Sequence, residues 1–136
     1  MRTVSAMVAF LVLILAIGWW SSHTLDSSAD KLYKEVKSIQ IALKHIESTQ
    51  EELPPTQWNQ AQSSISKLDK MWIRTRSQWM ILVDHRELDS IETSLARLNS
   101  YIKSKDVTLS KSELANLLLL IKHIPEKEAV NIRNIL

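Results

Sequence analysis

Cysteine is absent from this chain of 136 residues, and glycine occurs once and proline three times. Without cysteine there can be no disulfide, no thiol nucleophile and no cysteine-ligated zinc site. The scarcity of glycine and proline leaves few residues for tight turns and favours long helices over hairpins. The 17 basic and 15 acidic residues nearly balance and are interspersed, which argues against a nucleic-acid-binding surface.

One uncharged apolar run lies near the N-terminus, from Val4 to Trp20. At 1.5 Å per residue it spans roughly 25 Å, the short end of what crosses a bilayer. Arg2 precedes the run, and Trp19 and Trp20 end it, which is typical of a cytoplasmic flank and an aromatic interfacial belt. The pattern predicts a single-pass protein of the cell membrane, with a cytoplasmic tip at 1–3, a transmembrane anchor at 4–22 and an extracytoplasmic domain at 23–136.

A cleaved signal peptide is the alternative interpretation of this run. The small residues from Ser27 to Ala29 have a spacing that suits cleavage, but the bulky tryptophan pair would then lie inside the processing region. Lys31, Lys34 and Lys37 follow the run and dilute the charge bias that sets the orientation. We favour an uncleaved anchor with the N-terminus in the cytoplasm.

The rest of the chain has the period of amphipathic helices, because apolar residues recur at alternating spacings of three and four. The first such seam, in a helix expected at about 25–51, consists of Leu25, Ala29, Leu32, Val36, Ile39, Leu43 and Ile46. Pro54 and Pro55 then separate two helices. The second seam, in a helix expected at 55–83, consists of Trp58, Ala61, Ile65, Leu68, Trp72, Thr75, Trp79 and Leu82.

The periodicity changes phase after Leu82. Asp84 followed by Glu87 is a capping-box pattern, in which Asp84 accepts from the Glu87 amide and Glu87 reaches back. This pattern places a helix boundary near Val83 to His85, although no glycine or proline enforces it and one long kinked helix is the alternative. The third seam, in a helix expected at 85–104, consists of Leu88, Ile91, Leu95, Leu98 and Ile102.

The last helix is expected at 110–124, with Ser110 and Glu113 as a possible second capping box. Pro125 is expected to end this helix, and a short amphipathic tail at 126–135 follows. The fourth seam consists of Leu114, Leu117, Leu118, Ile121 and Ile124.

Four amphipathic helices with short connections predict an all-α fold, in which an N-terminal transmembrane helix precedes an antiparallel four-helix bundle. One helix of this kind cannot bury its apolar stripe alone, whereas four can share a core. The first bundle helix follows the anchor so closely that the two could form one continuous helix.

Several stretches resemble a bacterial family of small, N-terminally anchored proteins of unknown function. They are "WNQAQSSISKLDKMW", "ILVDHRELDSIETSLARLNSYIKSKD", "LLLLIKHIPEKE" and the closing "NIL". The resemblance covers nearly the whole chain after the anchor. It implies occurrence in Gram-positive spore-forming bacteria, genes beside those of YetF-like multi-spanning membrane proteins, and hence a YetF-like protein as candidate partner. It supplies no catalytic residues.

The stretch from Met71 to Asp89 is the best candidate for a partner or ligand surface. Trp72 and Trp79 lie on one helical stripe, and Arg76, four residues after Trp72, could stack on it. Plain core packing is the favoured interpretation of the tryptophans, because aromatic side chains on a seam supply a large buried area. The polar end of the stretch, Asp84 and His85, could pair and respond to pH, but a helix cap explains Asp84.

Metal binding and catalysis find little support. The histidines that could converge between helices are His45, His85 and His123, yet no inward Glu-x-x-His motif of the di-iron type occurs. There is no glycine-rich phosphate loop, nucleophile elbow or zinc-protease motif. We therefore predict no catalytic residue, no metal and no cofactor, and expect neither nucleic acid nor a small-molecule substrate.

The sequence thus predicts a membrane-anchored accessory protein that packs on, or stabilises, a larger membrane partner. The alternative is an extracytoplasmic bundle that senses a ligand or pH. A deep pocket beside Trp72 and Trp79 would favour sensing, whereas a solid core with an exposed apolar surface would favour docking.

Overall fold

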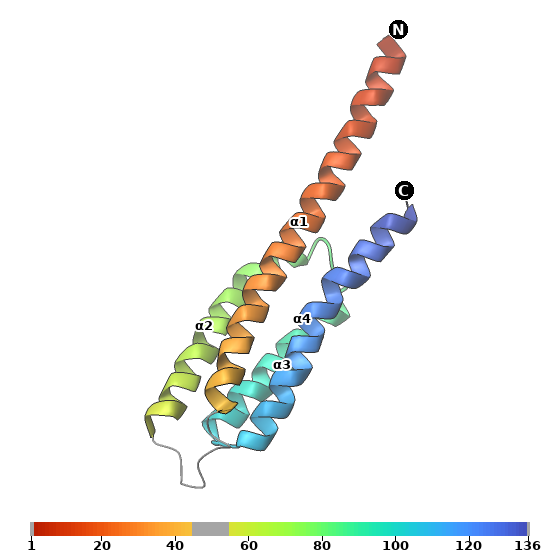
Figure 1. Ribbon diagram of the computed structural model, residues 1–136. Helices are drawn as coiled ribbons and strands as arrows, with labels where there is room; N and C mark the ends of the chain where they lie inside the picture. Colours follow the sequence, from red (N-terminus) through yellow and green to blue (C-terminus); the bar gives the residue numbers. More distant parts are fainter. Residues whose placement is uncertain (1, 45–54, 136) are drawn as a thin grey trace.

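The computed structural model describes residues 2–44 and 55–135 of the chain, with side chains described at 4–43 and 55–127. These residues form four helices and no strand, which confirms the all-α prediction. The helices are α1 (Arg2–Lys44), α2 (Pro55–Trp79), α3 (His85–Lys103) and α4 (Val107–Ile135). Each packs against two others, in the cyclic order α1, α2, α3, α4, and in Figure 1 each runs opposite to the one before it.

Helix α1 joins the apolar N-terminal run to the first seam without a break. The side chains from Val4 to Trp20 are almost all exposed, and this half of α1 stands clear of the other helices (Figure 1). Within the described part of the chain, α1 is the helix that is long and apolar enough to cross a membrane. The first buried side chains of α1 are Ser21 and Leu25. We call the end of the bundle at these two residues the proximal end, and the opposite end the distal end.

The predicted seams form the core. All described members of the first and second seams are buried except Leu82, which lies beyond the end of α2. All the predicted members in α3 and α4 are buried as well. Ile46 lies outside the described residues, as do residues 45–51 of the first expected helix. Because the core residues recur every three or four positions, each helix presents one continuous apolar stripe to its neighbours.

The second helix ends at Trp79, four residues before the predicted end at 83. Beyond it the chain turns back on itself, since the amides of Leu82 and Val83 both donate to the carbonyl of Trp79, at 2.9 and 2.8 Å. This turn buries Val83 and leaves Leu82 half-buried, so Leu82 packs against the core as predicted, but from the turn and not from the helical seam. The expected boundary near Val83 to His85 is confirmed, and the single kinked helix is not observed.

Helix α4 begins earlier and ends later than predicted. Asp106 caps its N-terminus, because Oδ1 accepts a hydrogen bond of 2.8 Å from the amide of Leu109. The helix then passes through Pro125 and continues to Ile135, so the predictions of an end at Pro125 and of a separate tail were wrong. Proline has no amide to donate to the carbonyl four residues earlier. Pro125 is itself buried, and α4 packs extensively on both α1 and α3, so tertiary packing offsets the lost bond.

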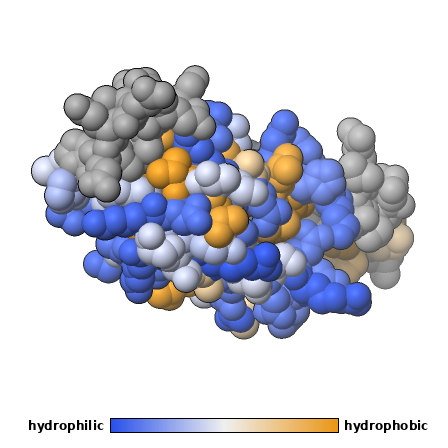
Figure 2. Space-filling view, turned by 90° about the horizontal axis from the view of Figure 1, so that it is seen from below, coloured by the Kyte–Doolittle hydropathy of each residue, from blue (hydrophilic) through white to orange (hydrophobic). Residues whose placement is uncertain are grey.

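The two described connections between helices differ in character. The proximal connection, between α2 and α3, reads Met80-Ile81-Leu82-Val83-Asp84, whereas the distal connection, between α3 and α4, reads Ser104-Lys105-Asp106. Lys105 adopts the left-handed conformation there, with φ of 57°. Seen from the distal end, the described surface is mostly hydrophilic, with scattered apolar side chains (Figure 2). The proximal connection is therefore the apolar one.

Candidate functional site

The tryptophans of the candidate stretch lie in the core. Trp72 is 4% exposed and Trp79 is fully buried, and their rings meet edge to face with centroids 5.9 Å apart. This arrangement is favourable for aromatic pairs. Neither residue lines either of the two hollows described below. The interpretation of these residues as core rather than as the walls of a ligand pocket is the one that the geometry supports.

Trp79 also makes a polar contact across the bundle. Its indole Nε1 donates a hydrogen bond of 2.8 Å to Oγ of Ser28 on α1. That hydroxyl in turn donates to the carbonyls of Thr24 and Leu25, at 2.7 and 3.0 Å. The bond fixes the end of α2 at a defined height on α1.

Arg76 lies half-buried on α2, one turn before its end, and forms an ion pair with Glu92 on α3. Its Nη1 also lies 3.5 Å from Sδ of Met80. Both sides of the ion pair remain partly in solvent, so it contributes little to stability. The guanidinium helps to join α2 to α3 at the proximal end.

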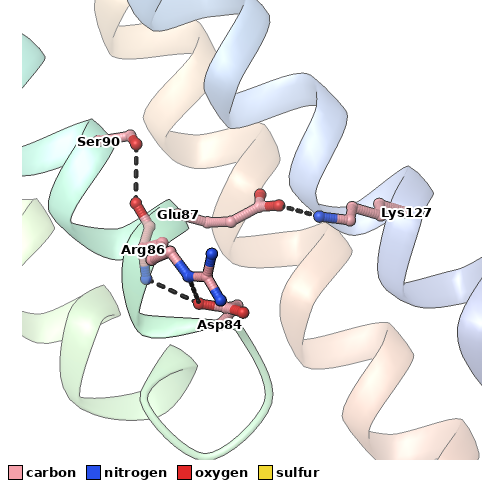
Figure 3. A network of polar contacts seen from close by, with 5 residues as sticks. All are labelled: Asp84, Arg86, Glu87, Ser90 and Lys127. Atoms are coloured by element: carbon pink, nitrogen blue, oxygen red, sulfur yellow. Dashed lines mark hydrogen bonds and ion pairs between the residues drawn. The ribbon is translucent and has the colours of Figure 1, made fainter.

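Asp84 is the N-cap of α3, as predicted, but with a different partner. Its Oδ1 accepts a hydrogen bond of 2.8 Å from the amide of Arg86, not from that of Glu87 (Figure 3). The Glu87 amide donates instead to the backbone carbonyl of Asp84, at 3.0 Å. His85 is the exposed first residue of α3. The cap therefore explains Asp84 without a metal or a charged histidine partner.

The predicted bond from the Glu87 side chain back to the cap residue is absent at this site. The Glu87 carboxylate points across to α4, where it pairs with Lys127 (Figure 3). Glu87 cannot reach back to the cap because this pairing directs its side chain away. The contact joins the first turn of α3 to the part of α4 beyond Pro125.

A buried polar cluster lies between α3 and α4, and the sequence reasoning missed it. Ser94 donates to Oε1 of Glu113 at 2.5 Å, and Nδ2 of Asn116 lies 3.0 Å from the same oxygen. Arg97 approaches the other carboxylate oxygen to 3.9 Å. The prediction of a capping box at Ser110 and Glu113 was wrong, because α4 begins at Val107 and both residues lie inside the helix. The available signal was that Ser94 and Glu113 directly precede the seam residues Leu95 and Leu114.

Among the hollows of the described surface is a pair of grooves with a volume of about 450 Å³ each. The first lies between α1 and α4 at the proximal end, where Asp26, Asp30, Tyr33, Lys122 and Glu126 give it a polar rim. The second lies between α3 and α4 beside the buried cluster, and Arg97 and Asn116 line part of it. Both are open grooves rather than enclosed cavities.

The described residues do not gather a metal-binding group. No three histidine or acidic side chains among them are placed to share an ion. His123 is exposed and lies 3.9 Å from Glu126, on its own helix, and His85 is exposed at the start of α3. His45 lies outside the described residues.

Over residues 2–44 and 55–135, these features define a small all-helical fold with one helix that is long and apolar enough to cross a membrane. The chain belongs to the family described as Domain of unknown function (DUF4363), whose model matches residues 19–135 and so includes Trp19 and the whole bundle. No curated protein and no solved structure matches the chain. The resemblance to a family of unknown function is confirmed to that extent, and the bacterial host and the YetF-like neighbour stay predictions.

Proposed function

We propose that this chain is a membrane-anchored accessory protein that packs on, or stabilises, a larger membrane protein. In this proposal residues 1–3 are cytoplasmic, residues 4–22 cross the cell membrane, and the antiparallel four-helix bundle stands outside the cytoplasm. A YetF-like protein is the candidate partner, by the family resemblance alone. The proposal includes no catalytic activity, cofactor or small-molecule substrate.

The observation that carries the proposal is the exposed apolar half of α1. From Val4 to Trp20 the helix shows its apolar side chains on all sides, and the bundle does not cover them. In water such a surface would be very unfavourable, so it requires lipid or protein around it. Because α1 is continuous, whatever surrounds this half is mechanically joined to the bundle.

The bundle itself supports an anchor that is not cleaved. Cleavage after Ala29 would remove Leu25 and Ala29, which the core buries, and Ser28, which accepts the hydrogen bond from Trp79. The remaining fragment would leave an indole donor and apolar surface without cover. The signal-peptide alternative is therefore costly for the fold.

Two measurements test the anchor and its topology. A reporter fused after Leu136 should be active only outside the cytoplasm, and the full-length chain should remain in the membrane fraction after alkaline extraction. A soluble product that begins near Asp30 would overturn the anchor and favour a signal peptide.

A third measurement tests the partner. A photo-crosslinking residue at Leu13, on the exposed half of α1, should give a discrete protein adduct in native membranes. The same residue at Ile41, which is exposed at the distal end of α1, is the matched control and should not give that adduct. If Leu13 yields only lipid adducts, the accessory role fails while the anchor stands.

A ligand-sensing bundle is the second candidate, and the groove between α1 and α4 favours it. The groove has an apolar floor, formed in part by Ala29 and Ile121, and a polar rim. A ligand bound there would join the helix that crosses the membrane to α4. Lys122→Glu, which inverts a charge on the rim, should abolish a ligand response under this candidate and leave the Leu13 adduct unchanged under the first.

A further inference from the structure

The turn between α2 and α3 exposes apolar side chains that a helix connection in water normally lacks. Ile81 is 86% exposed and Met80 is 45% exposed, although Trp79 and Val83 on either side are buried. The turn is held in place by the two hydrogen bonds to the Trp79 carbonyl and by the Asp84 cap. Its exposed residues therefore form a fixed apolar tip.

The distal connection provides the contrast. Its residues, Ser104, Lys105 and Asp106, are polar, as expected for a turn that faces water. Both connections belong to the same bundle and join helices of similar size. The apolar tip is thus a property of the proximal connection, and the other described connection lacks it.

The height of the tip follows from the bond between Trp79 and Ser28. Ser28 follows Trp20 by eight residues, a rise of roughly 12 Å along α1. Helix α2 runs opposite to α1 (Figure 1), so beyond Trp79 the chain leaves α2 in the direction of the apolar half of α1. A bilayer has a headgroup layer roughly 5–7 Å thick on each side of its hydrocarbon core. A membrane helix is usually tilted by about 20°, and such a tilt brings one side of the bundle nearer to the bilayer. If the bilayer surrounds the run that ends at Trp20, the tip reaches the headgroup layer.

We propose that Met80 and Ile81 bind the phospholipid surface and form a second membrane contact beside the anchor. This proposal rests on the membrane anchoring argued above. The two side chains would enter the headgroup layer on the side of the bilayer where the exposed indoles of Trp19 and Trp20 lie. Arg86 lies in the first turn of α3, at the same end of the bundle, and its side chain is 93% exposed although Nε approaches Oδ1 of Asp84 to 3.9 Å. The guanidinium can therefore reach lipid phosphates.

The consequence is a bundle with one orientation on the membrane. A bundle held by one membrane helix is free to rotate about that helix and to tilt. A second membrane contact at the turn, away from the axis of α1, restricts both motions. The turn is joined to α1 through Trp79 and Ser28, and its helix α3 is joined to α4 through Glu87 and Lys127. A fixed orientation would present the same outer face of the bundle to every membrane partner.

The absence of cysteine allows a direct test with the full-length chain. Ile81→Cys and, as the matched control, Leu109→Cys would each carry an environment-sensitive fluorophore, with one chain in each phospholipid nanodisc. Leu109 is an exposed apolar residue near the start of α4, at the distal end. We expect the label at position 81 to show blue-shifted emission, protection from aqueous iodide and quenching by lipids spin-labelled at the headgroup. The label at position 109 should show none of these.

Equal exposure of both labels to water, in chains that stay with the nanodiscs, would overturn this proposal and leave the anchor intact. Loss of the chain from the nanodiscs would overturn the anchor and this proposal together. Protection of the label at position 81 only in discs that hold two chains would identify a second copy, and not lipid, as the occupant. Met80→Asp should reduce the protection of the Ile81→Cys label, because a carboxylate enters the headgroup layer poorly.

Discussion

Trp79 and Ser28 lie 51 residues apart in the sequence and 2.8 Å apart in the fold, where the indole donates to the hydroxyl. Trp79 is fully buried, so its N–H has no access to solvent. A second polar contact joins the same two helices, because Nζ of Lys67 on α2 lies 2.6 Å from Oε2 of Glu35 on α1. The rest of the contact consists mainly of apolar side chains, which leave more freedom in the relative sliding of two helices. The bond between Trp79 and Ser28 is the buried one of these two contacts, and it helps to set the register of α2 on the helix that carries the apolar N-terminal run.

The first prediction concerns this bond. Ser28→Ala should destabilise the protein by about 1–3 kcal/mol, because it leaves a buried N–H without an acceptor. Ser38→Ala is the control, since its hydroxyl is exposed and bonds only to the carbonyl of Glu35 on its own helix. Chemical denaturation of the full-length chain in detergent micelles would measure both. Equal stability of the two variants would show that the bond does not contribute.

The second prediction concerns the tryptophan pair. Trp72→Ala should cost about 3–5 kcal/mol, as expected for truncation of a buried aromatic residue. Trp58→Ala should cost less, because Trp58 lies in the first turn of α2, beside a helix end that can adjust. Melting temperatures of the two variants test this order. An unchanged melting temperature in Trp72→Ala would remove the residue from the core and raise the case for a binding role.

The third prediction concerns the cap of α3. Asp84→Ala should destabilise the protein by about 0.5–2 kcal/mol, and Asp84→Asn should restore most of the loss, because a neutral amide oxygen accepts the same bond. Melts of both variants with and without a chelator provide the measurement. If asparagine proved as damaging as alanine and a chelator mimicked the change, Asp84 would be a metal ligand and not a cap.

The fourth prediction concerns pH. Burial raises the pKa of the Asp69 carboxyl above its usual range, and the charge of Lys103 opposes part of that rise. A group with a raised pKa in the folded state stabilises the fold most below its unfolded pKa, and that contribution is lost as the pH rises through the folded pKa. Asp69→Asn should therefore melt at a higher temperature than the parent at neutral pH, and the difference should vanish in acid.

Asp89→Asn, at an exposed position of α3, is the control for this pH series and should melt like the parent throughout. The gain in melting temperature from Asp69→Asn would be due to packing if it persisted unchanged at a pH below the usual range of an aspartate pKa. In that case the desolvation argument would fail.

For the stretch from Met71 to Asp89, part of the observed structure could be predicted from the sequence and part could not. Its tryptophans could be assigned to the core because their spacing placed them in phase with Ile65 and Leu68. The Asp84 cap could be recognised because capping depends on residues close in sequence. The direction of the Glu87 side chain could not be predicted, since its partner Lys127 lies on another helix, 40 residues away. No local rule specifies such a partner.

The sequence by itself determined most of the buried apolar residues, because heptad spacing places them on one face of any helix they form. It also determined the continuous apolar run of α1, since composition alone marks a segment that water does not favour. Tertiary structure decided where two helices end. Trp79 ends α2 because the turn that follows buries Val83, and α4 passes Pro125 because packing on α1 and α3 offsets one lost hydrogen bond. It also decided which polar side chains meet, as with Ser28 and Trp79, because that depends on how far one helix is rotated and displaced against another.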